Sequence, residues 1–62
     1  MPKYHLNDKL LVSPYLTHLQ EWVVGSVIDV EDNPFNGWVY SVKTDTGDIF
    51  SETENFFKPV EA

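Results

Sequence analysis

The chain has 62 residues, with ten acidic residues against four lysines and a net charge of −6 at pH 7. A chain of this length forms one domain, because a domain of about 60 residues buries only about 60% of the surface that its unfolded chain exposes. It has no cysteine, which excludes disulfides. The N-terminal MPKYHLNDK has no apolar h-region and no apolar run reaches about 18 residues, so we expect neither a signal peptide nor a membrane span. We therefore expect one soluble, cytoplasmic domain over residues 1–62.

The charge also bears on the partner. The chain contains no arginine, and its four lysines are dispersed, at positions 3, 9, 43 and 58. Binding to duplex nucleic acid depends on neutralising several phosphates with lysine or arginine, and a net negative field repels polyanions. We expect no binding to free nucleic acid and favour a protein or basic peptide as partner. The lysines could form one modest patch only if the fold brought them together.

Residues 1–8 are a polar lead-in, in which Tyr4 and Leu6 alternate with polar neighbours and could pack on the domain. The first strand is predicted at Lys9–Val12. Ser13 then suits a helix N-cap and Pro14 a first helical position, which favours one or two helical turns within residues 13–20. An irregular long loop is the alternative for this segment.

The longest strand is predicted at Trp22–Val30, where β-branched residues dominate. Gly25 within it is typical of a bulge or a sharp bend. Both faces of this strand are partly apolar. Val23 and Val27 share one face, and the other face carries Trp22, Val24, Ser26, Ile28 and Val30. A bulge would switch the set that points inward.

The acidic stretch after this strand is predicted as a solvated loop, in which Asn33-Pro34 begins a turn. Glu31 and Asp32 do not have the spacing of a calcium-binding EF-hand loop, so we predict no metal site and no cofactor. Phe35 either folds back over the domain or projects as an anchor for a partner, since aromatic anchors are enriched at binding hot spots.

A third strand is predicted at Trp38–Thr44, with Trp38, Tyr40 and Val42 on one face. Asp45-Thr46-Gly47 then closes a hairpin onto residues 48–51. In that fourth strand Ile49 points inward and Phe50 outward, or the reverse.

A helical turn is expected within Glu52–Phe57, followed by a last strand at Lys58–Val60. Pro59 suits an edge strand there because it cannot donate to an interior ladder. At least one of Phe56 and Phe57 should belong to the core, which we expect to span about residues 9–60.

This order of elements resembles the SH3-like barrel over about Lys9 to Val60. The strand Lys9-Leu10-Leu11-Val12 followed by Gly25-Ser26-Val27-Ile28-Asp29-Val30 looks like the arrangement in Tudor and KOW domains. The chain is also similar to small stand-alone bacterial proteins of this barrel type, some of them provisionally labelled as transcriptional regulators. The resemblance implies an all-β, five-stranded antiparallel barrel with a long first loop and a short helical turn before the last strand.

No residue pattern indicates catalysis, because neither His5 nor His18 lies in a motif that pairs it with a nucleophile or a metal. We predict that the protein is not an enzyme but a binding module, acting on a partner protein through an acidic, aromatic-rich surface. The candidate binding residues are Tyr15, Leu16, Trp22, Glu31, Asp32, Phe35, Trp38, Tyr40 and Phe50.

Two more specific surfaces are conceivable among these residues. Tudor-like modules hold methylated lysine or arginine in an aromatic cage through cation–π contact. By this resemblance the cage candidates are Trp22, Trp38, Tyr40 and Phe50. An apolar patch is the other expectation, formed by Tyr15, Leu16, Leu19, Phe35 and Trp38.

Two other functions remain open from the sequence. One is an accessory of the transcription or translation machinery that docks on a protein, as the KOW resemblance implies. The other is a structural or assembly subunit, since an exposed strand edge promotes self-association. We expect a monomer, with a weak dimer as the alternative.

Overall fold

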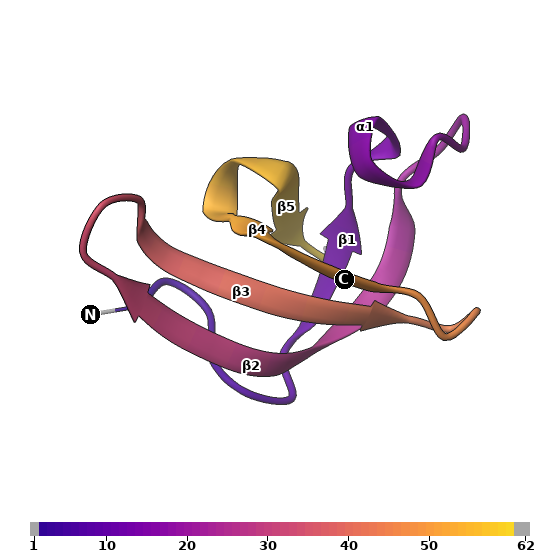
Figure 1. Cartoon of the computed structure of the whole chain (residues 1–62). Coiled ribbons are helices and arrows are strands. Elements are labelled where there is room, and N and C mark those ends of the chain that lie inside the picture. Colours follow the sequence, from indigo (N-terminus) through magenta and orange to yellow (C-terminus); the bar gives the residue numbers. More distant parts are fainter. Residues whose placement is uncertain (1, 61–62) are drawn as a thin grey trace.

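The structure is a computed structural model that describes residues 2–60. Its five strands form one antiparallel sheet in the order β4-β3-β2-β1-β5 (Figure 1). The elements in chain order are β1 (Lys9–Val12), α1 (Pro14–Thr17), β2 (Val23–Asn33), β3 (Gly37–Thr44), β4 (Ile49–Thr53), the 3-10 turn η1 (Glu54–Phe56) and β5 (Phe57–Pro59). The prediction of a mostly antiparallel, five-stranded β fold is confirmed.

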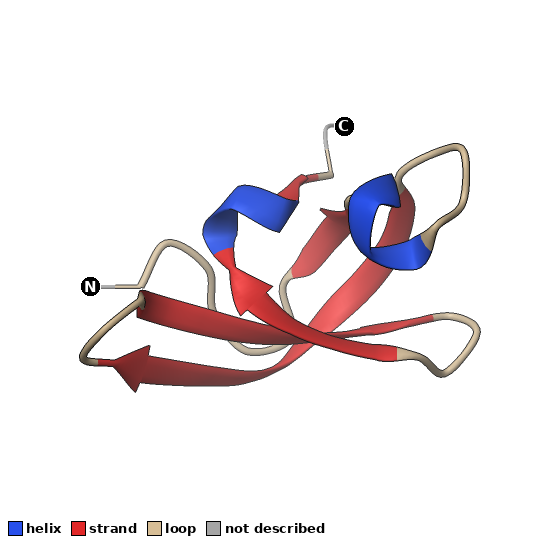
Figure 2. Ribbon diagram, turned by 45° about the horizontal axis from the view of Figure 1, so that its top comes forward, coloured by secondary structure: helices blue, strands red, loops and turns tan. Residues whose placement is uncertain are grey.

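Strand β2 belongs to both halves of the sheet, and this makes the sheet curl. Its first residues pair with β1, setting Leu10 opposite Gly25, and from Gly25 to Asn33 it pairs with β3. Figures 1 and 2 show β2 and β3 as long, curved ribbons. Within residues 2–60 no ladder joins β4 to β5, so backbone hydrogen bonds do not close the sheet. The structure therefore contains a strongly curled antiparallel sheet, and the closed barrel that we expected is not formed by the backbone hydrogen bonds of these residues.

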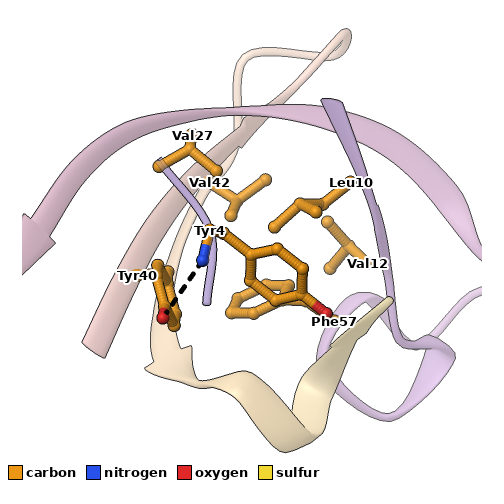
Figure 3. Close-up of a cluster of buried hydrophobic side chains, with 7 residues drawn as sticks. All are labelled: Tyr4, Leu10, Val12, Val27, Tyr40, Val42 and Phe57. Carbon is orange, nitrogen blue, oxygen red and sulfur yellow. Dashed lines mark hydrogen bonds between the residues drawn. The ribbon is translucent and has the colours of Figure 1, made fainter. Parts of the chain in front are cut away.

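The core lies on the concave side of this sheet. Figure 3 shows its seven buried side chains, which come from four strands and the N-terminal segment: Tyr4, Leu10, Val12, Val27, Tyr40, Val42 and Phe57. Burying an apolar side chain of this size contributes roughly 1.5–3 kcal/mol. A core this small leaves little reserve, because domains of about 60 residues are marginally stable.

The core reaches further toward the N-terminus than residue 9. The ring of Tyr4 is buried and meets the ring of Tyr40 edge-on, with 5.3 Å between centroids. The Tyr40 hydroxyl accepts the backbone N–H groups of Lys3 at 2.7 Å and Tyr4 at 3.4 Å, the second of which is drawn in Figure 3. Leu6 remains exposed. The N-terminal segment therefore supplies one residue of the core, and its backbone N–H groups are hydrogen-bond partners of the buried Tyr40 hydroxyl.

The segment after β1 forms a helical turn, as Ser13 and Pro14 predict. The Ser13 side chain accepts the N–H of Tyr15 at 3.1 Å, and Pro14 is the first helical residue. The turn ends at His18, which has a left-handed φ of 63°. Irregular chain is thus limited to the few residues between His18 and β2.

Strand β2 is longer than predicted. It starts at Val23, leaving Trp22 outside, and continues to Asn33, so the acidic stretch expected to be a loop is part of the strand. Pairing with β3 stabilises this polar extension. The turn is short, because the Asn33 side chain accepts the N–H groups of Phe35 and Asn36, at 2.8 and 3.0 Å.

The irregularity in β2 lies after Val27 and not at Gly25. The register shifts between Val27 and Asp29, so that buried Val27 precedes the bulge and Val30 packs against the core after it. The bulge therefore changes which residues of β2 point inward, from odd-numbered to even-numbered positions, as expected. Gly25 has a different role, since a Cβ there would lie 2.6 Å from Cγ1 of Val42. Glycine is needed at this position for close approach of two strands.

The second half of the chain follows the predicted order. Thr44 and Asp48 close the β3–β4 turn, with 2.8 Å between the Thr44 nitrogen and the Asp48 carbonyl oxygen. In β4 it is Phe50 that packs against the core, whereas Ile49 is exposed. Phe57 is buried, and Pro59 lies on edge strand β5 as expected.

Candidate binding site around Trp38

The candidate binding residues fall into several separate regions. Tyr40 is fully buried and belongs to the core, so it contributes to no surface. Leu16 packs against the core, and the ring of exposed Tyr15 lies 5.7 Å from that of Phe56. Phe35 lies in the β2–β3 turn, at the opposite end of the molecule from α1 (Figure 1). The expected apolar patch that joins Phe35 to the first loop therefore does not form.

The four cage candidates do not converge either. Trp22 stacks beneath Lys58, whose Nζ lies 4.4 Å from the ring centroid. Phe50 lines a groove next to the β3–β4 turn, and Tyr40 is in the core. Trp38 lies in another groove, beside η1. The expectation of one four-ring cage is not met.

Trp38 is the candidate with acidic neighbours on both sides. Its ring is half-buried and packs against the core. Its register partner on β2 is Asp32, and directly opposed residues of antiparallel strands point to the same face. Glu54, at the start of η1, lines the same groove as Trp38. We call Trp38, Asp32 and Glu54, with the groove that Trp38 and Glu54 line, the Trp38 site.

The groove has a volume of about 330 Å³. It is lined by Asn36, Gly37, Trp38, Thr53, Glu54 and Asn55. Within residues 2–60, no lysine lies within 4 Å of a carboxylate, His5 lies 3.9 Å from Asp8, and the side-chain hydrogen bonds leave the carboxylates of Asp32 and Glu54 unengaged. An indole ring beside two free carboxylates attracts a cation, both through its π face and through ion pairing.

The backbone holds this site in a defined register. Gly37 has a φ of 84°, a left-handed conformation that glycine adopts without strain, and it leads directly into Trp38. The pairing of Val39 with Thr53 fixes the start of η1 next to Trp38. Hydroxyls of Ser41 and Ser51, 2.8 Å apart, add a cross-strand link. The site therefore rests on paired strands and not on a long loop.

Glu54 is the residue of this site that the sequence interpretation missed. Its position follows from the β3–β4 turn, because the pairing of Val39 with Thr53 makes residue 54 the next neighbour of Trp38. Register in a hairpin is fixed by its turn. Counting outward from Asp45-Thr46-Gly47 along both strands would have found it. Glu31, by contrast, pairs with Val39 on the outer face and does not face the Trp38 groove.

A second groove, of about 360 Å³, lies between the first loop and the β3–β4 turn. Its lining combines Phe50 and Leu19 with two carboxylates, Asp45 and Asp48. Here one acid is already engaged, because the Asp48 carboxylate accepts the Thr46 hydroxyl at 3.1 Å. Of the candidate binding residues only Phe50 lies here, together with Leu19 of the expected apolar patch. The Trp38 site retains more acceptors for an incoming cation.

Within residues 2–60, no three histidine or carboxylate side chains are placed to bind a metal ion together. Neither α1 nor η1, the helical segments of the described chain, has the length or apolarity to cross a membrane. A comparison with protein-family models, with curated proteins and with solved structures found no match to this chain. A function for it therefore has to follow from its own sequence and geometry.

Proposed function

We propose that this protein is a non-enzymatic binding module that receives a basic, extended segment of a partner protein at the Trp38 site. The observation that carries the proposal is the half-buried Trp38 ring with Asp32 on one side and Glu54 on the other. A cation over a tryptophan face contributes about 0.5–2 kcal/mol, depending on desolvation. An exposed ion pair adds roughly 0.2–1 kcal/mol.

Contacts of this size give a modest affinity for one basic side chain, so neighbouring residues of the partner must contribute as well. Phe35 is placed to supply such a contact. It is 92% exposed in the turn that leads into Trp38. Exposed aromatic side chains of this kind anchor partners at hot spots. We propose that Phe35 packs on an apolar residue next to the bound lysine or arginine.

The field of the whole chain favours the same partner. A net charge of −6 steers basic segments toward the protein and speeds their association at low salt. Binding should weaken as salt is raised, because exposed charges are screened over about 8 Å at physiological ionic strength.

We also propose that the curled sheet is an SH3-like barrel. Three features support this assignment: the strand order β4-β3-β2-β1-β5, a bent β2 shared by both halves, and a 3-10 turn directly before β5. A fold of this type hosts many functions, so the proposed activity rests on the Trp38 site and not on the fold.

The test is a titration of the isotope-labelled protein with a nine-residue peptide that alternates lysine and valine, followed by amide and indole NMR shifts. We expect the Trp38 indole and the amides of Asp32 and Glu54 to shift most. Trp38→Ala should weaken binding about tenfold, the equivalent of about 1.4 kcal/mol. Trp22→Ala is the matched control, because it removes the other tryptophan, which lies away from the site. Equal losses for both variants, with the fold intact, would overturn the proposal.

A further inference from the structure

The convex face of the sheet gathers three of the four lysines. Lys9 on β1 and Lys43 on β3 both pair with Ser26 of β2, so the two lysines flank one residue on one face. Lys58 lies in the neighbouring row, as the register partner of Leu11 on β1. We call this surface the lysine face. It comprises Lys9, Leu11, Trp22, Val24, Ser26, Lys43, Ile49 and Lys58.

The ammonium groups on this face have no carboxylate within 4 Å among residues 2–60. Lys9 donates to the Ser26 hydroxyl at 2.7 Å, and Lys58 lies over the Trp22 ring. Both contacts orient a cation without neutralising it. Three cations therefore lie together on a protein whose net charge is −6, and the carboxylates of Asp29 and Glu31 lie further along β2 on the same convex face.

Apolar side chains separate these cations. Val24 is the register partner of Leu11, and Ile49 is that of Lys43, so apolar and charged residues share adjacent rows. Val24 and Ile49 are 39% and 55% exposed. A recess of about 270 Å³ lies at the β1–β5 edge of this face, lined by Leu11, Lys58, Pro59 and Val60. Its volume is ample for an aliphatic side chain, and three of its four lining residues, Leu11, Pro59 and Val60, are apolar.

We propose that the lysine face binds an acidic, amphipathic segment of a partner protein. Charge complementarity selects carboxylates for Lys9, Lys43 and Lys58. The exposed apolar side chains and the recess favour leucine or isoleucine between those carboxylates, since burying them stabilises a complex by about 25 cal/mol per Å² of apolar area. This surface is separate from the Trp38 site, and neither proposal depends on the other.

The same observations disfavour nucleic acid as the occupant. Affinity for a phosphate backbone grows with the number of phosphates neutralised, and three lysines without any arginine neutralise few. Exposed valine and isoleucine side chains make no favourable contact with phosphates, whereas they suit an amphipathic protein segment.

The test is an NMR titration with a sixteen-residue peptide of glutamate and leucine, arranged as an amphipathic helix. We expect the amides of Lys9, Ser26, Lys43 and Ile49 to shift, while the Trp38 indole does not. The same peptide with serine in place of leucine should bind about tenfold more weakly. Shifts centred on the Trp38 site, or equal binding of the serine peptide, would overturn the proposal.

A matched pair of charge variants sharpens the test. Lys43→Glu should weaken the binding of the acidic peptide about fivefold, and Lys3→Glu makes the same change in net charge. Lys3→Glu, which changes charge at the lysine outside this face, should have little effect, because its Nζ lies near Tyr4. An equal effect of Lys3→Glu would contradict the proposal. So would stronger binding of a single-stranded oligonucleotide than of the peptide, or sedimentation showing that a second copy occupies the face.

Discussion

The Trp38 site and the lysine face lie on opposite sides of the same strands and carry opposite charge. Trp38 is on the concave face of β3, whereas Lys43 of the same strand is on the convex face. The alternation of side chains along a strand separates them. A net charge of −6 therefore does not describe either surface, and each presents its own local field.

The two regions also differ in how they are supported. Trp38 packs against the core, so its ring contributes to stability as well as to the proposed site. Lys9 and Lys43 are exposed and flank the middle of the sheet, where β2 is paired on both sides. Substitutions on the lysine face should therefore leave the fold intact, whereas those at Trp38 need a control for folding.

The largest expected effect comes from a substitution that disturbs the packing of the strands on which both regions lie. Gly25→Ala should destabilise the protein by about 1–3 kcal/mol, because the added Cβ meets the Val42 side chain and, at 3.0 Å, the Lys43 carbonyl oxygen. Urea denaturation measures this loss, and both peptides should then bind less well. Gly37→Ala is the comparison for steric contact. Its added Cβ would meet no atom within 4 Å, but alanine would be strained by the positive φ at this position. A Gly25→Ala variant as stable as the natural protein would show that the strands can move apart.

The next largest effect comes from removing the negative charges of the Trp38 site, which should change the binding of the two peptides in different ways. Asp32→Asn combined with Glu54→Gln should weaken the lysine–valine peptide about fivefold, through loss of ion pairs and cation attraction. The same double variant should bind the glutamate–leucine peptide at least as tightly as before, because it lowers the net negative charge. Isothermal titration of both peptides measures this. Parallel losses for the two peptides would mean that they share one surface.

The dependence of peptide affinity on salt concentration should differ between the two regions. The basic peptide is attracted both by the Trp38 site and by the net charge, so its affinity should fall steeply between about 0.05 and 0.3 M salt. The acidic peptide is attracted locally but repelled by the net charge, and salt screens both. Its affinity should change by less than about threefold over the same range. Equal slopes would contradict the assignment of opposite local fields.

The smallest effect concerns Phe35. Phe35→Ala should change the free energy of unfolding by less than about 0.5 kcal/mol, because the side chain is 92% exposed. It should weaken the basic peptide about threefold and leave the acidic peptide unaffected. Thermal melting with both titrations checks this, and a marked loss of stability would place Phe35 against the domain instead.

The features predicted well from sequence are those that depend on neighbours in the chain. Ser13 and Pro14 cap a helical turn by local hydrogen bonding and fixed φ, and the chain forms that turn. Asp45-Thr46-Gly47 specifies a hairpin in the same way, and the Gly47 φ of 92° is the conformation that the turn requires. Such signals act over a few residues, so they can be read without knowing the fold.

Features that depend on distant residues were predicted only as open possibilities, as for Tyr4 and the lysines, or not at all. The acidic end of β2 is a strand because β3 pairs with it, although its composition is typical of a loop. Tyr4 enters the core through Tyr40, 36 residues away. Likewise Lys9 and Lys43 become neighbours only through Ser26 between them. Cross-strand neighbours of this kind follow from register, which composition does not specify.

The two edges of the sheet are unequal, and this limits how copies of the chain can assemble. Strand β4 ends the sheet on one side with five residues, without a neighbouring strand on its outer side within residues 2–60. Strand β5 ends it on the other side with three residues, one of them Pro59, which has no N–H to donate. Backbone pairing with another strand is therefore favoured along β4, which is longer than β5 and contains no proline.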